Sequence, residues 1–84
     1  MNKIKIEKDI LQIIGKILKI SYLKIKLKSK SKNIKNWDSI NNLKIFLEIE
    51  KKFRIRINEN FFFKELNISS IIKIVEKEIK LNKK

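Results

Sequence analysis

The polar residues best placed for chemistry in this sequence are Asp38 and Ser39, which stand directly before an apolar segment with helical spacing. At a helix N-terminus the backbone N–H groups lack partners and the helix dipole is positive, so an anion attached there is stabilised. Asp is a good N-cap residue, and a hydroxyl on the first turn projects outward. Ser39 is therefore well placed to hold a phosphate or a phosphodiester without disturbing a core.

Catalysis by this serine fits the composition poorly. The sequence contains no His and no Cys, so the usual base that activates a serine, the usual zinc ligands and any disulfide are missing. Two pairs of carboxylates are closely spaced, but the two members of each pair fall on different faces of their predicted helix. These pairs are Glu48 with Glu50 and Glu76 with Glu78. We therefore expect no enzymatic activity, no catalytic residue and no metal site.

The length limits the chain to one small domain, residues 1–84. A domain of this size buries only about 60–65% of its unfolded surface, so without a disulfide or a metal it needs efficient helix packing. Its longest apolar stretch, ILQIIGKILKI, is broken by Gly and Lys. We therefore expect no membrane-spanning segment and no cleavable signal, and a soluble cytoplasmic protein is the default interpretation.

The first predicted helix, at about residues 3–20, has a continuous apolar face. Its members recur at steps of three and four and are Ile6, Ile10, Ile13, Ile17 and Ile20, widened by Leu11, Ile14 and Leu18. Gly15 lies inside this helix at a cost of about 1 kcal/mol relative to Ala. The glycine indicates either close packing at that point or simple tolerance.

Three more helices are expected, at about residues 39–53, 61–66 and 69–81. The core face predicted for the second consists of Ile40, Leu43, Leu47 and Phe53, extended by Phe46 and Ile49. The third has room for only one or two turns. The fourth has possible N-caps at Asn67, Ser69 and Ser70, and a core face of Ile68, Ile71, Ile72, Val75 and Ile79. The predicted fold is all-α, a small four-helix bundle with a long first connector and a short third helix.

The connector between the first two helices is strongly basic. Residues 24–35 contain six lysines and no acid, out of a formal net charge of +13. Leu23, Ile25 and Leu27 alternate with lysines as in a half-buried strand, but only residues 54–57 offer a similar pattern as a partner. We favour an extended connector that lays these apolar side chains on the helical core. Its lysines are either simply solvated or contact acidic enzymes, an anionic membrane or nucleic acid.

The motif Asp38-Ser39-Ile40 resembles the Asp-Ser-Leu signature of acyl carrier proteins, and the longer WDSI form is common among stand-alone carriers. The similarity continues in register over the rest of the chain: LEIEKKF resembles the end of that family's second helix, RIRIN its short extended segment and NISSI the capped start of its last helix. Asp-Ser pairs alone often do no more than cap helices. The matching order of elements is what favours a carrier over an unmodified helical bundle of the same shape.

The resemblance implies carriage of acyl groups rather than catalysis. It implies that a phosphopantetheinyl transferase moves a 4′-phosphopantetheine arm from coenzyme A to Ser39, beside Asp38, and that the arm holds acyl intermediates as thioesters. Fatty acid synthesis, polyketide assembly and amino-acid carriage all use such carriers, and we expect a role in fatty acid or polyketide-type biosynthesis. The implied partners are acyltransferases, ketosynthases or other acyl-processing enzymes, and the carrier itself is expected to be a monomer.

Contacts with these partners are expected around the serine, at Trp37, Ile40, Leu43 and Glu48. Carriers of this family usually dock through an acidic second helix, whereas here Asn41, Asn42 and Lys44 stand where acids are often found. Docking would then rely on apolar residues or on acidic patches of the partners. Trp37 either guards the arm or, as we favour, packs over the junction before the helix.

The interior of the bundle is expected either to shelter the acyl chain or simply to be a filled core. Candidate lining residues are Leu43, Phe46, Leu47, Phe63 and Ile68. The alternative function is that of a small basic helical protein that binds nucleic acid or an anionic membrane. Nucleic acid is not expected, because the lysines follow a connector and a tail rather than one helix and the aromatic residues cluster in FFF.

Overall fold

The computed structural model describes residues 3–82, without the side chains of Lys32, Phe63 and Asn82. This part of the chain forms three α-helices, α1 (Lys3–Leu18), α2 (Ser39–Phe53) and α3 (Ile68–Asn82). Three short 3₁₀ helices lie between them, η1 (Tyr22–Lys24), η2 (Ser31–Asn33) and η3 (Glu59–Phe63). Residues 3–82 contain no strand, only one isolated antiparallel bridge between Lys30 and Asn67. The described fold is all-α.

The short helix predicted at residues 61–66 is a 3₁₀ helix, so three α-helices are present where four helices were predicted. Its start is set by Asn58, whose side-chain oxygen accepts a hydrogen bond of 2.9 Å from the N–H of Asn60. At its end the N–H of Lys64 bonds the carbonyl of Phe61 at 3.3 Å. The spacing of this last bond is that of the tighter 3₁₀ turn, whose poorer hydrogen-bond geometry keeps such helices short.

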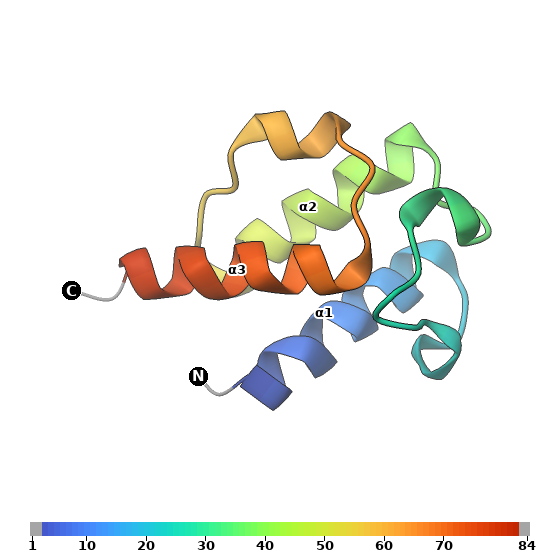
Figure 1. The fold of residues 1–84 in the computed structure, drawn as a ribbon, viewed down its shortest axis with the longest axis horizontal. Helices are drawn as coiled ribbons and strands as arrows, with labels where there is room; N and C mark the ends of the chain where they lie inside the picture. Colours follow the sequence, from blue (N-terminus) through green and yellow to red (C-terminus); the bar gives the residue numbers. More distant parts are fainter. Residues whose placement is uncertain (1–2, 83–84) are drawn as a thin grey trace.

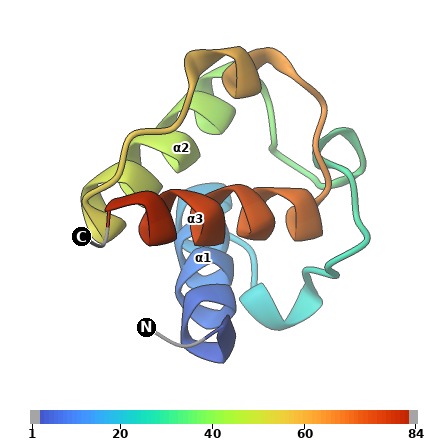
Figure 2. The ribbon, with the colours of Figure 1, turned by 60° about the vertical axis from the view of Figure 1, so that its left-hand side comes forward.

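The helices pack around α1, which contacts both α2 and α3, while η3 lies over α2. Figure 1 shows the long connector between α1 and α2 closing the right-hand side of the molecule. In Figure 2, α3 crosses α1 steeply and α2 runs along another side. Within residues 3–82, none of the helices combines the length and the apolar character needed to cross a bilayer.

The core is apolar and draws on every α-helix and on two loops. Its buried members are Ile6, Ile10, Ile14, Leu18, Ile25, Ile45, Phe46, Ile49, Ile55, Ile57, Ile68, Ile71, Ile72 and Val75. The face predicted for α3 is confirmed at four of its five positions, with Ile79 half-buried. In α1 the buried stripe is rotated from the predicted one, because Ile13 and Ile17 are only half-buried.

The core face predicted for α2 is wrong at three of its six positions. Ile40, Leu43 and Leu47 are 67%, 45% and 49% exposed. Phe46 and Ile49 are buried as predicted, and Ile45, which was not predicted, is buried as well. This helix has apolar residues on two sides, so their periodicity alone does not decide which side faces inward.

Contacts from outside the helix decide how α2 is rotated. The ring of Phe46 stacks on that of Phe62 in η3, with centroids 5.0 Å apart. The side chain of Glu50 accepts a hydrogen bond of 2.8 Å from the N–H of Ile57. These two contacts hold one edge of α2 against η3 and the loop of residues 54–58. The side with Ile45 and Ile49 is buried in the core, where α2 contacts α1, and Leu43 is left exposed.

Close packing, and not tolerance, accounts for Gly15. A Cβ at this position would lie 2.8 Å from the carbonyl oxygen of Ile20 and 3.2 Å from the backbone N of Tyr22. The chain folds back here because Lys19 adopts a left-handed conformation, with φ of 59°, and the N–H of Ile20 bonds the carbonyl of Gly15 at 3.0 Å. The helix therefore ends at Leu18 and does not reach residue 20.

The connector was predicted to lay its alternating apolar side chains on the core, but only one of the three is buried there. Ile25 is buried, but Leu23 is 79% and Leu27 is 39% exposed. The reason is that the backbone turns twice in this stretch. The N–H of Lys24 bonds the carbonyl of Ser21 at 3.0 Å, and a second turn follows over residues 26–29.

The start of α3 explains the path of the connector. The first amides of a helix have no partner within it. Here the N–H of Ile68 bonds the carbonyl of Ser29 at 3.2 Å, and the N–H of Ser69 bonds the carbonyl of Leu27 at 2.9 Å. Asn67 caps the next amide with its side-chain oxygen. The connector thus supplies acceptors that α3 needs.

Candidate functional site

Ser39 is the first residue of α2, and its side chain is exposed. Asp38 has extended backbone angles, and its Oδ1 accepts a hydrogen bond of 2.8 Å from the N–H of Asn41, so its predicted role as N-cap is confirmed. The N–H of Asn42 bonds the carbonyl of Asp38, also at 2.8 Å. The Asp38 carboxylate is thus engaged with the helix, and Ser39 beside it is exposed.

The turn before Ser39 is held at both ends by asparagines. Asn36 has φ of 71°, a left-handed conformation that Asn tolerates better than most residues. Its side-chain N–H donates to the carbonyl of Leu18 at 3.1 Å, and its own carbonyl accepts a bond of 2.8 Å from the side chain of Asn41. These bonds tie the start of α2 to the end of α1.

Asn42 connects the serine turn to η3. Its Oδ1 accepts a hydrogen bond of 2.8 Å from the indole N–H of Trp37, and its Nδ2 donates to the carbonyl oxygen of Phe62. Trp37 is half-buried against the core, which supports the favoured role of packing over the junction. Hydrogen bonds thus join Trp37, Asn42 and Phe62 beside Ser39.

An open groove of about 680 Å³ borders Ser39. Its lining residues are Ser31, Trp37, Asp38, Ser39, Ile40, Asn42, Leu43, Phe62, Lys64 and Glu65. The groove offers apolar walls next to the exposed Ser39, and its charged lining residues are Lys64 and the carboxylates Asp38 and Glu65. This groove can accept a flexible substituent that is linked to Ser39 through a phosphate, and Lys64 can balance the charge of that phosphate.

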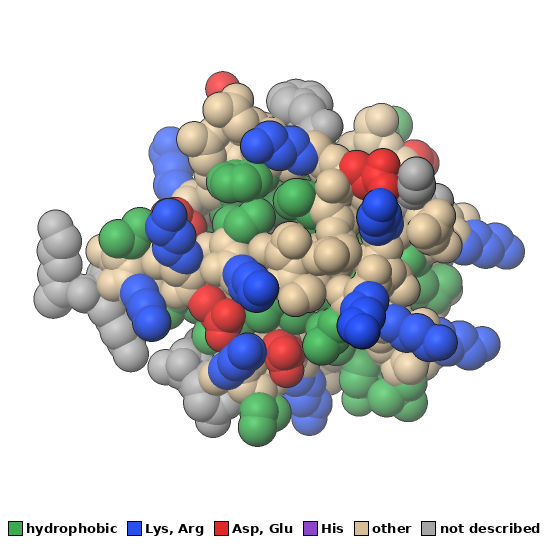
Figure 3. Space-filling model, in the orientation of Figure 1, with side chains coloured by type: hydrophobic (Ala, Val, Ile, Leu, Met, Phe, Trp, Pro, Cys, Tyr) green, Lys and Arg blue, Asp and Glu red, His purple; other side chains and the backbone are tan. Residues whose placement is uncertain are grey.

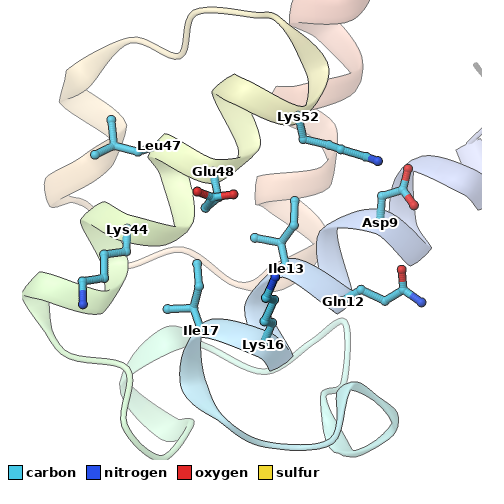
Figure 4. A pocket seen from close by; sticks show the side chains of 9 residues that line it. All are labelled: Asp9, Gln12, Ile13, Lys16, Ile17, Lys44, Leu47, Glu48 and Lys52. Carbon is cyan, nitrogen blue, oxygen red and sulfur yellow. The ribbon is translucent and has the colours of Figure 1, made fainter.

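A second groove, of about 550 Å³, lies between α1 and α2 and is shown in Figure 4. Ile13 and Ile17 of α1 and Leu47 of α2 form its apolar part, and the rest is Asp9, Gln12, Lys16, Lys44, Glu48 and Lys52. Asp9 is 5% exposed and pairs with Lys5 at 3.3 Å, while its Oδ2 has no hydrogen-bond partner among the described residues. This groove holds no residue of the serine site.

The structure brings together most of the residues predicted for partner contact. Trp37, Ile40 and Leu43 line the groove of Ser39, whereas Glu48 lines the second groove. The predicted acyl-chain lining is dispersed. Phe46 and Ile68 are fully buried, Leu43 and Leu47 lie in different grooves, and the side chain of Phe63 lies outside the described residues.

Sequence reasoning missed the roles of Asn42, Phe62 and Lys64 at this site. Asn42 follows Ser39 by three residues, and side chains at this spacing share a helix face, so a local signal existed. Phe62 and Lys64 reach the site only because η3 folds back over α2. No signal within the helix could have located them.

The geometry defines a class of site: an exposed hydroxyl on the first turn of a capped helix, next to an open and mainly apolar groove. No group of three or more metal-ligating side chains occurs among the described residues. In comparisons with known proteins, no family model, no curated protein and no solved structure matches this chain.

Proposed function

We propose that this protein is a carrier of the acyl carrier type and that Ser39 is the attachment point for a 4′-phosphopantetheine arm. The observation that carries the proposal is the exposed hydroxyl of Ser39 at the start of α2, with Asp38 engaged as a cap and an open groove alongside. A serine in this position is accessible to a modifying enzyme. It also has no His to activate it as a nucleophile, because the sequence contains none.

The order of elements supports the same proposal. A long connector precedes the helix that begins at the serine, a short 3₁₀ helix follows it, and a last helix closes the chain. In the acyl-carrier bundle that the sequence resembles, η3 would take the place of the short third helix. The fold that we propose is thus that four-helix arrangement with its third helix reduced to a 3₁₀ turn.

The residues around Ser39 fit the proposed group. Ser39 Oγ would form the phosphoester, and Lys64 in the same groove supplies a positive charge for the phosphodiester. Ile40 and Leu43 would lie along the apolar part of the arm. When bound, the arm supplies a thiol that holds acyl groups as thioesters, and the tether keeps them at high effective concentration near partner enzymes.

The proposed partners are a phosphopantetheinyl transferase and acyl-processing enzymes such as acyltransferases and ketosynthases, in fatty acid or polyketide-type biosynthesis. The exposed apolar side of α2 supports contact at Ile40 and Leu43, since both side chains are more exposed than a core role would allow. Contacts of this kind need no acidic helix, and α2 offers few acids.

The proposal is tested by intact mass after incubation with coenzyme A and a promiscuous phosphopantetheinyl transferase. We expect a gain of one phosphopantetheinyl group in the wild type and none in Ser39→Ala. Ser31→Ala is the matched control, because Ser31 lines the same groove and should not receive the group. No gain with a transferase that modifies a reference carrier, or a gain that persists in Ser39→Ala, would contradict the proposal.

A further inference from the structure

Two leucines of the connector, Leu23 and Leu27, stand outside the core. Leu23 is 79% and Leu27 is 39% exposed, while Ile25 between them is 7% exposed. Leu23 lies in η1, which is capped by the side chain of Ser21. Leu27 lies in the turn that a hydrogen bond of 3.0 Å closes between Ser29 N–H and Lys26 carbonyl. Each leucine is thus presented on a separate tight turn.

The backbone holds these turns in place. Ile25 anchors the segment in the core. The carbonyl of Leu27 accepts a hydrogen bond of 2.9 Å from Ser69, and that of Ser29 accepts one of 3.2 Å from Ile68, both at the start of α3. These anchors lie between the two leucines and at and after Leu27, and they hold the backbone of this segment against the core and α3.

Lysines flank the two leucines in the sequence. Lys24, Lys26, Lys28 and Lys30 are all exposed, and no Asp or Glu occurs anywhere in the sequence between Asp9 and Asp38. Figure 3 shows hydrophobic and basic side chains gathered side by side at the lower right, where Figure 1 places the connector. We call the surface formed by Leu23, Leu27 and these four lysines the connector face.

This combination matches the chemistry of an anionic lipid surface. Lysines near such a surface each raise the affinity about fivefold, and apolar side chains between them can enter the headgroup boundary. Nucleic acid would use the lysines but would leave the leucines in water. Single-strand binding also favours stacking aromatics or Arg, and residues 23–35 contain neither.

We propose that the connector face binds anionic lipid bilayers at their surface, with Leu23 and Leu27 inserted at the headgroup boundary and the lysines on the lipid phosphates. Binding of this kind is peripheral and uses no spanning helix. It does not depend on the modification of Ser39, which lies outside the connector face at the start of α2. The protein would thus present its serine site from a membrane surface.

The test is co-sedimentation of the full chain with vesicles of phosphatidylcholine alone and of equal parts phosphatidylcholine and phosphatidylglycerol. We expect binding to the anionic vesicles only, weakened by salt. Replacing Lys24, Lys26 and Lys28 together by Gln should lower the partition coefficient at least about tenfold. Leu23→Ser with Leu27→Ser should lower it about tenfold at unchanged charge.

Matched variants separate this surface from general effects of charge and hydrophobicity. Replacing the exposed Lys73, Lys77 and Lys80 of α3 by Gln makes the same change in net charge. Ile4→Ser with Leu81→Ser removes two side chains that are 77% and 57% exposed elsewhere. We expect both controls, and Ser39→Ala, to bind the anionic vesicles like the wild type. Thermal unfolding would show that all variants fold.

Several results would overturn the proposal. These are no binding to anionic vesicles, equal weakening by the connector and α3 lysine variants, or wild-type binding by the double leucine variant. Tighter binding to duplex DNA or to polyglutamate than to the anionic vesicles would assign the connector face to nucleic acid or to an acidic protein instead. Loss of binding in Ser39→Ala would show that the surface lies at the serine groove.

Discussion

The indole N–H of Trp37 donates a hydrogen bond of 2.8 Å to the side-chain oxygen of Asn42, within the first turn of α2. The amide nitrogen of the same side chain donates to the carbonyl of Phe62. A flipped carboxamide would set N–H against N–H and oxygen against oxygen, so the two bonds fix its orientation. Asn42 thus joins Trp37 and Phe62, which both line the Ser39 groove.

Asn42→Ala should destabilise the protein by about 1–3 kcal/mol, because it leaves the Trp37 N–H and the Phe62 carbonyl without their partner. Chemical denaturation followed by tryptophan fluorescence would measure the loss. Asn41→Ala is the control, since its side chain makes one exposed bond to Asn36. Equal losses in the two variants would show that Asn42 has no special connecting role.

Gly15→Ala should lower the free energy of unfolding by about 1–3 kcal/mol, because the added Cβ would lie 2.8 Å from the backbone oxygen of Ile20. At an open helix position the same change would instead stabilise by about 1 kcal/mol. The sign of the change in a urea titration therefore tests the close packing. Lys16→Ala, at the exposed neighbouring position, should shift stability by no more than about 0.5 kcal/mol.

Glu50→Ala should cost about 1–3 kcal/mol, since the Ile57 N–H loses a charged acceptor at 2.8 Å. Glu50→Gln should cost less, because its side-chain oxygen can still accept the bond. Thermal unfolding of both variants would show which loses more stability, with Glu48→Ala at an exposed position as the control. A larger loss for Gln than for Ala would rule out the hydrogen bond as the cause.

Asp9→Leu should raise the free energy of unfolding by about 1 kcal/mol or more, because it removes a buried carboxylate with an unpartnered oxygen. The groove between α1 and α2 gives the larger side chain room. Lys5 is 58% exposed and remains hydrated after the change. Guanidinium unfolding would measure the gain, and a marked loss of stability would mean that the ion pair is a net stabilising contact.

Ile40→Ser should slow modification of Ser39 at least about fivefold while changing stability by no more than about 0.5 kcal/mol, because Ile40 is 67% exposed beside the serine. Initial rates with coenzyme A and a transferase, read by mass, would show the effect. Ile4→Ser, which changes a side chain that is 77% exposed on α1, should leave the rate unchanged. Equal rates for Ile40→Ser and wild type would remove Ile40 from the docking surface.

Local signals in the sequence determined where the main helices begin and which face α3 buries. Asp38 caps α2 as predicted, and the predicted Ile68, Ile71 and Ile72 of α3 are buried. Arg54 and Arg56 point outward while Ile55 and Ile57 are buried, as their alternation predicted. These features depend on caps and on periodicity, which involve residues a few positions apart.

Tertiary structure decided the rest of the site. It set the rotation of α2, it brought Phe62 and Lys64 beside Ser39, and it kept Leu23 on the surface. The apolar residues of α2 occupy two sides of the helix, so either side satisfies the same local pattern. Only contacts between segments far apart in the sequence, such as those of α2 with α1, could choose between them.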